Sequence, residues 1–239
     1  MSAASQVLHA RRWFDSETQK KLWEQRVDMG WPEHLNPFSV LVAAMGNYWY
    51  PGCRAAVEGM CQLAWEQGYP VTLWEESDRC FNPYDGLGSM RNMAYMKALR
   101  EGYEYVCYVD NDIQPEADTL VRLQRRFVPV VSPIIRYADG DTHGMDLAAM
   151  EQGKGLALVS SCVLSMVLFQ TQVFLPWALT PFWDNAIGSD ESYHFARLAM
   201  AGHRPFVDTD VAVVAMKPPT FPLKERLDAR TWVTLNGRD

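Results

Sequence analysis

The chain has 239 residues, of which 48% are hydrophobic and 21% charged, and its formal net charge is −7. This composition excludes a disordered or collagen-like chain and suits one large domain with a buried core. The negative charge argues against a broad surface for nucleic acid or for an anionic membrane.

Cysteine use favours a reducing compartment, and the distribution of apolar residues argues against a signal peptide and a membrane span. The chain has five cysteines, an odd number, and no two of them form a C-x-x-C pair. We interpret them as reduced thiols rather than as a disulfide framework or a zinc site. The start MSAASQVLHARRW lacks the apolar segment of a signal peptide, and the most apolar run, residues 156–169, is too short to span a bilayer. We therefore expect a cytoplasmic protein with no transmembrane segment.

The first predicted element is a helix over residues 16–29. Ser16 and Gln19 form a capping box, and Leu22, Trp23 and Val27 follow at helical spacing. Residues 1–37 are accordingly assigned to an N-terminal helical extension.

From residue 38 the chain alternates between short β-rich runs and helical patterns. Strands are expected at 38–45, 69–76 and 103–110, and helices at 53–67, at 90–102 and from Pro115 to about Phe127. Met93 and Phe127 are expected to point inward from the last two helices. This order is typical of a parallel sheet with right-handed crossovers. The expected fold class is α/β, with a mostly parallel central sheet flanked by helices.

The second half of the chain is less regular and forms a smaller subregion. We expect a strand and loop at 128–141, then one or two buried strands, or a strand and a short helix, at 155–175. A helix follows at about 190–201 and a strand at 204–216. Residues 38–216 are assigned to one domain with halves 38–127 and 128–216, and residues 217–239 to a C-terminal tail.

Acidic residues follow the second and third predicted strands. Glu75 and Glu76 end the second strand, and Asp110 and Asp112 end the third, with Asn111 between them. Ligands of parallel sheets bind at the carboxyl ends of the strands. Carboxylate oxygens suit Mg²⁺ or Mn²⁺, which share their coordination shell with phosphates and water. The alternative is an acidic turn that solvates the end of a strand.

The stretch GSMRNMAYMKALREGYEYVCYVDNDIQP, residues 88–115, resembles the nucleotide-sugar half of GT-A glycosyltransferases, especially family 2-like members. The resemblance implies a GT-A-like (Rossmann-like) sheet. It also implies that Asp112 and Asp110 bind a divalent ion at a sugar diphosphate, Asp110 holding a metal-bound water or the ribose. Arg91 would face the diphosphate, and Asn111 would line the same site. On its own, Arg91 is equally well explained as a surface arginine at the start of a helix.

The resemblance assigns further donor contacts. Glu75 or Glu76 stands where the family has an acid that binds the nucleotide base. Ala44 lies in the first strand, where the family holds the nucleotide, although the usual Pro-x-Tyr-Asn turn is absent. Many relatives have a metal-binding His after the late strand. Here that region, VAVVAMKPP, has none, and Lys217 is the nearby residue that would neutralise the diphosphate.

The stretch FWDNAIGSDESYHFARLAMAGHRPFVDTDV, residues 182–211, resembles the acceptor half of the same family. In that half an acidic pair opens a helix, and one acid is the general base that deprotonates the acceptor hydroxyl. Asp190 is the first candidate for this base and Glu191 the second. Helix capping by Asp190 is the competing explanation. Trp183 and Asp184 would line the acceptor site, although Trp183 equally suits the core.

Other polar motifs have weaker functional interpretations. Asp139, Asp141 and His143 alternate in a stretch that contains turn glycines, which favours a polar loop over a second metal site. The pair Asp208 and Asp210 opens the late strand and is expected to be structural. The histidines His143, His194 and His203 lack ligand spacing and are expected to be solvated or capping.

The expected function is a nucleotide-sugar-dependent glycosyltransferase of hexosyltransferase type, assisted by Mn²⁺ or Mg²⁺. Likeness to family 2 implies inversion of the anomeric centre, with a retaining relative that has the same donor motif as the alternative. The alternatives are a non-catalytic module that binds a nucleotide sugar or a glycan, and a sugar-phosphate nucleotidyltransferase. The acceptor is a glycan, a lipid-linked glycan or a small molecule. Modified DNA is disfavoured by the acidity of the chain.

Overall fold

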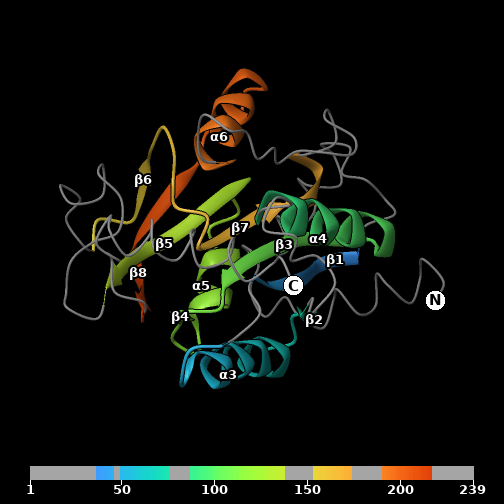
Figure 1. The fold of residues 1–239 in the computed structure, drawn as a ribbon, viewed down its shortest axis with the longest axis vertical. Helices are drawn as coiled ribbons and strands as arrows, with labels where there is room; N and C mark the ends of the chain where they lie inside the picture. Colours follow the sequence, from blue (N-terminus) through green and yellow to red (C-terminus); the bar gives the residue numbers. More distant parts are fainter. Residues whose placement is uncertain (1–35, 46–48, 76–86, 138–152, 174–189, 217–239) are drawn as a thin grey trace, which may run out of the picture.

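The computed structural model describes residues 36–45, 49–75, 87–137, 153–173 and 190–216 (Figure 1). The predicted N-terminal helix, the C-terminal tail and the loop at 139–143 lie outside these residues. So do four of the candidate site residues: Glu76, Trp183, Asp184 and Lys217. The predicted domain boundaries therefore stay predictions.

A single eight-stranded sheet forms the centre of the described part of the chain, in the order β2-β1-β3-β7-β5-β8-β4, with β6 paired to β8. The strands are β1 (Asn36–Met45), β2 (Val71–Glu75), β3 (Tyr103–Asp110), β4 (Ile113–Gln114), β5 (Val130–Tyr137), β6 (Leu156–Leu158), β7 (Met166–Gln170) and β8 (Phe206–Ala215). β1 pairs in parallel with β2 and β3, and β5 pairs in parallel with β8. β7 runs antiparallel to both of its neighbours, β3 and β5. The expected, mostly parallel sheet is confirmed for its main strands, whereas β7 at its centre and the short β4 and β6 run antiparallel to their neighbours.

Helices cover both faces of the sheet. α3 (Cys53–Glu66) and α5 (Thr119–Gln124) bury their apolar residues against one face, and α4 (Leu87–Glu101) and α6 (Asp190–Met200) against the other. Figure 1 shows α3 and α4 on opposite sides of β1 and β3. β3 is buried on both faces, which explains why its sequence YEYVCYVD is almost continuously apolar rather than alternating.

Two helix predictions need correction. α4 begins at Leu87, three residues before its predicted start, and Met93 is 38% exposed whereas Arg91 and Tyr95 are buried. The predicted helix from Pro115 to Phe127 is reduced to α5, because its first residues instead follow β4, which pairs with the late part of β8. Phe127 lies beyond the helix with a φ of 52°. Long-range strand pairing therefore overrode the local helical pattern.

His194 also differs from the prediction that it is solvated or capping. The ring is fully buried in α6 and lies 5.4 Å from the ring of Phe169 in β7, measured between centroids. Phe195 and Leu198 are buried beside it and dock α6 on the sheet. His194 therefore belongs to the core in this structure.

Four cysteines fall in the described residues, at 53, 61, 107 and 162, and all four are free thiols. Among the described helices, none combines the length and the apolarity that crossing a bilayer requires.

Candidate functional site

Strand register brings the predicted donor-side residues to one edge of the sheet. Ala44 in β1 lies opposite Glu75 in β2, and Met45 lies opposite Asp110 in β3. These residues stand at the carboxyl ends of three parallel strands, the edge at which α/β sheets bind their ligands. Glu75, Asp110 and Ala44 thus share one edge, as the sequence predicted.

Arg91 is the most unusual of the predicted site residues. Its side chain is only 2% exposed, and its Nη2 lies 3.7 Å from Oδ1 of Asp110, whose side chain is 19% exposed. Burying a guanidinium is unfavourable unless charge and hydrogen bonds compensate. The interpretation of Arg91 as a surface arginine is therefore wrong. The fold places the buried positive charge of Arg91 next to Asp110, the carboxylate at the end of β3.

Tyr108 connects Arg91 to the same strand. Tyr108 precedes Asp110 by two residues, so both side chains lie on the face of β3 that α4 covers. The Tyr108 hydroxyl donates to the backbone carbonyl of Arg91 at 2.9 Å. Burial raises the pKa of the Tyr108 phenol well above its usual value, which keeps the hydroxyl protonated.

The turn from Asp110 to Asp112 is held by backbone hydrogen bonds to four other segments of the chain. Asp110 N–H donates to Ser165 O at 2.7 Å, just before β7, and Asn111 N–H donates to Met45 O at 2.9 Å. Two further bonds complete the frame, from Tyr50 N–H to Asn111 O at 3.0 Å and from Met216 N–H to Asp112 O at 2.8 Å. The position of the turn is thus fixed by β1, the loop before α3, the start of β7 and the end of β8.

Asp112 lies near the start of α3. Cys53, the first residue of α3, is buried, and its burial raises the pKa of its thiol, with the charge of Asp112 adding to the effect. Asp110 lies beside Arg91 of α4 instead. Asp110 thus lies beside α4, and Asp112 follows it by two residues at the same carboxyl edge.

Glu75 is engaged by two residues that the sequence analysis did not single out. Its Oε1 accepts a hydrogen bond of 2.8 Å from Trp49 Nε1, and its Oε2 accepts one of 3.1 Å from Arg54 Nη2. Arg54 also pairs with Glu58 one turn further along α3. Trp49 follows the first strand in a loop that must lie at the carboxyl edge, and Arg54 lies just beyond that loop in the first turn of α3. This position was the available signal.

The predicted metal site offers oxygen ligands of the right kind but few of them. Among the described residues, no group of three or more His, Cys, Asp or Glu side chains is gathered closely enough to hold an ion. Asp110 and Asp112 supply two carboxylates. Mg²⁺ and Mn²⁺ are commonly held by one or two carboxylates together with substrate phosphates and waters. The residues present therefore fit an ion that binds with a phosphorylated ligand.

The predicted general base lies at the start of α6. Asp190 and Glu191 are the first two residues of this helix, as expected, but their side chains lie outside the described residues. Their roles remain predictions.

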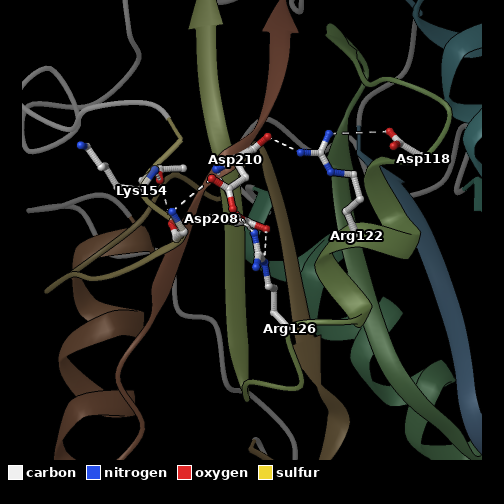
Figure 2. Close-up of polar contacts among 8 residues, drawn as sticks. Asp118, Arg122, Arg126, Lys154, Asp208 and Asp210 are labelled. Carbon is white, nitrogen blue, oxygen red and sulfur yellow. Dashed lines mark hydrogen bonds and ion pairs between the residues drawn. The ribbon is translucent and has the colours of Figure 1, made fainter. Parts of the chain in front are cut away.

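A second polar cluster lies away from this edge, on β8. The guanidinium of Arg126 contacts Asp208 through Nε and Nη2, both at 2.7 Å, and Nη2 also contacts Asp210 at 2.5 Å (Figure 2). β8 bulges here, because Asp208 pairs with Pro133 whereas the next paired residue, Ala212, faces Ile134. The backbone N–H of Gly155 donates to Asp210 at 3.1 Å. Asp208 and Asp210 are thus bound to the framework, as expected for a structural pair.

Comparison with known proteins gives information on the fold. No family model matches the chain, and no curated protein matches its sequence. Among solved structures, it is similar to GalNAc-T7, determined with UDP, GalNAc and Mn²⁺, at a TM-score of 0.50 and 11% identity. The match covers 75% of this chain and 44% of that one, so this chain spans less than half of GalNAc-T7. The fold is GT-A-like.

Two other solved structures overlap this chain less closely. Drosophila β1,4-galactosyltransferase 7, in complex with manganese, UDP-Gal and xylobiose, gives a TM-score of 0.49 at 15% identity over 75% of this chain and 71% of that one. A protein from STIV gives 0.43 at 10% identity over 77% and 96%.

Proposed function

We propose that this protein is a glycosyltransferase that moves a sugar from a nucleotide-diphosphate donor to an acceptor hydroxyl. The observation that carries the proposal is the buried guanidinium of Arg91, 3.7 Å from Asp110 at the carboxyl edge of a GT-A-like sheet. A diphosphate leaving group gains negative charge as its bond to the sugar breaks. A fixed cation in a partly dry site stabilises that charge more than water does.

The donor-side residues have separate roles in this proposal. Arg91 stabilises the diphosphate, and Asp110 and Asp112 hold Mn²⁺ or Mg²⁺, with Asn111 beside them. The bound ion would supply a further positive charge for the leaving diphosphate. Glu75, oriented by Trp49, accepts hydrogen bonds from the nucleotide base. Ala44 lies opposite Glu75 in the strand register, and Ala44, Glu76 and Lys217 are proposed as additional donor contacts.

The acceptor side is proposed from the position of α6. Asp190 accepts the proton of the acceptor hydroxyl, and the N-terminus of the helix favours its ionised form. Glu191 is the second candidate, and Trp183 and Asp184 line the acceptor. Attack from the face opposite the diphosphate would invert the anomeric centre, as in the family 2-like proteins that the sequence resembles.

The proposal is tested by donor binding and hydrolysis. UDP-, GDP-, CDP- and dTDP-sugars are titrated with Mn²⁺ or with chelator, on the wild type and on Asp112→Ala. We expect one donor to bind and to hydrolyse slowly with Mn²⁺, and Asp112→Ala to lose at least tenfold in affinity. The matched control is Glu116→Ala, since Glu116 is a nearby acid whose side chain is 73% exposed.

Each outcome has a distinct meaning. Binding of a donor without turnover over a panel of glycan, lipid-linked and small-molecule acceptors favours a non-catalytic nucleotide-sugar-binding module. Equal binding by Asp112→Ala and the wild type removes the metal role of this turn. Binding of no donor, with or without Mn²⁺, contradicts the proposed function.

A further inference from the structure

One hydrogen bond joins the face of β3 to the backbone of α4 next to the candidate site. Tyr108 is fully buried, and its hydroxyl donates to the carbonyl of Arg91 at 2.9 Å. A carbonyl oxygen has two acceptor sites, and the helical hydrogen bond uses one of them. The tyrosine can therefore bind the helix without breaking its internal bonds.

The ring of Tyr108 is held as firmly as its hydroxyl. It packs edge to face against Phe169 of β7, with centroids 5.8 Å apart and planes at 69°. Phe169 in turn contacts His194 of α6. Rings fixed in this way leave the hydroxyl one position, because rotation about the side chain would break the packing.

We propose that Tyr108 is a positioning residue, whose hydroxyl fixes the backbone of Arg91 so that the guanidinium stands against Asp110, where it meets the diphosphate of a nucleotide ligand. This inference rests on the proposed function. A core role alone does not require the hydroxyl, because phenylalanine fills nearly the same volume without a polar group to desolvate. The hydroxyl is bonded instead to the residue that carries the buried cation of the site.

The test is a double-mutant cycle with Tyr108→Phe, Arg91→Gln and the double variant. The measured quantities are the melting temperature and the Kd for UDP, GDP, CDP or dTDP with Mn²⁺, using whichever binds the wild type most tightly. The matched control is Tyr105→Phe. Tyr105 is a buried tyrosine of the same strand, three residues earlier, and packs on the opposite face.

We expect Tyr108→Phe to weaken nucleotide binding about fivefold in the wild-type background, the factor that corresponds to one ordinary hydrogen bond. It should have no effect on Kd in the Arg91→Gln background, because the side chain it positions is gone. Its effect on the melting temperature should be equal in both backgrounds, since the bonded carbonyl remains. Tyr105→Phe should leave Kd unchanged.

Three results would overturn the inference. Tyr108→Phe could bind like the wild type, it could lose the same factor in both backgrounds, or Tyr105→Phe could lose as much. If Arg91→Gln does not fold, the Kd values of Tyr108→Phe and Tyr105→Phe are compared instead. Each is measured at the same interval below the melting temperature of its variant. A wild type that binds none of the four nucleotides overturns the proposed function, and this inference with it.

Discussion

Asp208 is a buried residue whose charge matters to stability. Its side chain is 0% exposed, and two hydrogen bonds from Arg126 compensate for its burial. Removal of one partner from such a pair strands the other charge in the interior. Arg126 thus joins the loop after α5 to the bulge in β8.

Arg126→Met is expected to lower the free energy of unfolding by about 3 kcal/mol, near the lower end for breaking a buried pair, because Arg126 is itself 31% exposed. Arg125→Met is the matched control. Arg125 is the neighbouring exposed arginine, and it bonds Gln67 and Tyr69 at the surface, so its loss should change stability by less than about 0.5 kcal/mol. Urea unfolding of both variants measures the difference. Equal effects would show that Asp208 does not depend on this partner.

The same cluster gives a pH dependence of known sign. The hydrogen bond from Arg126, followed by that from Gly155, lowers the pKa of Asp210 below its ordinary 3.8. A depressed pKa contributes stability above the unfolded-state value and loses it as the pH falls through the folded-state value. The stability difference between the wild type and Asp210→Asn should thus be constant above about pH 5 and shrink below about pH 4. A difference that grows on acidification would contradict this assignment.

At the scale of the element, the sequence predicted the strands and helices that are rich in local signals. β1, α3, β3, α6 and β8 fall within two residues of their predicted limits. The errors lie where distant contacts decide. β4 consists of two residues that pair with β8, and β7 pairs antiparallel with both β3 and β5. No local pattern in either segment specifies those partners.

For the candidate site, too, local signals could be predicted from the sequence and distant contacts could not. The acids at the strand ends could be predicted, because strand ends and sheet edges follow from the order of elements. The burial of Arg91 could not, since it depends on how α4 rotates over β3. Trp49 and Arg54 were missed because their common partner, Glu75 in β2, lies 26 and 21 residues further along the chain.

Two glycines, one inside a helix and one just after a helix, allow a prediction about stability. Gly59 lies inside α3, and Gly202 follows α6 with a φ of 84°; a Cβ added to either would meet no atom within 4 Å. Gly59→Ala should raise the free energy of unfolding by about 0.5–1 kcal/mol, because alanine favours the helix. Gly202→Ala should lower it by about 1 kcal/mol, because its φ is left-handed. Thermal or urea unfolding checks the opposite signs, and two effects of equal sign would contradict the backbone assignment.

At the scale of the whole molecule, the net charge disfavours an anionic ligand, whereas the topology provides the sheet edge at which such a ligand would bind. The chain carries a net charge of −7, which repels a nucleotide diphosphate at long range. The carboxyl edge itself holds two acids, Asp110 and Asp112. Binding of the proposed nucleotide ligand must therefore depend on nearby cations, and Arg91 is one that the fold itself supplies. A divalent ion would supply the rest only if it arrives together with the phosphates.

This dependence predicts synergy between metal and nucleotide in the stability of the whole chain. Mn²⁺ alone, with two carboxylates to bind it, should raise the melting temperature by less than about 1 °C, and UDP with chelator by a similar amount. Both together, at one hundred times their joint Kd, should stabilise by about 2.7 kcal/mol, or about 5–10 °C for a chain of this size. Where another nucleoside diphosphate binds more tightly than UDP, it replaces UDP. Differential scanning calorimetry of the wild type, Asp112→Ala and Glu116→Ala measures the shifts, and the synergy should vanish only in Asp112→Ala. If Mn²⁺ alone protects as well as the mixture, the protein holds a complete metal site of its own and the edge from Asp110 to Asp112 is not where the ion binds.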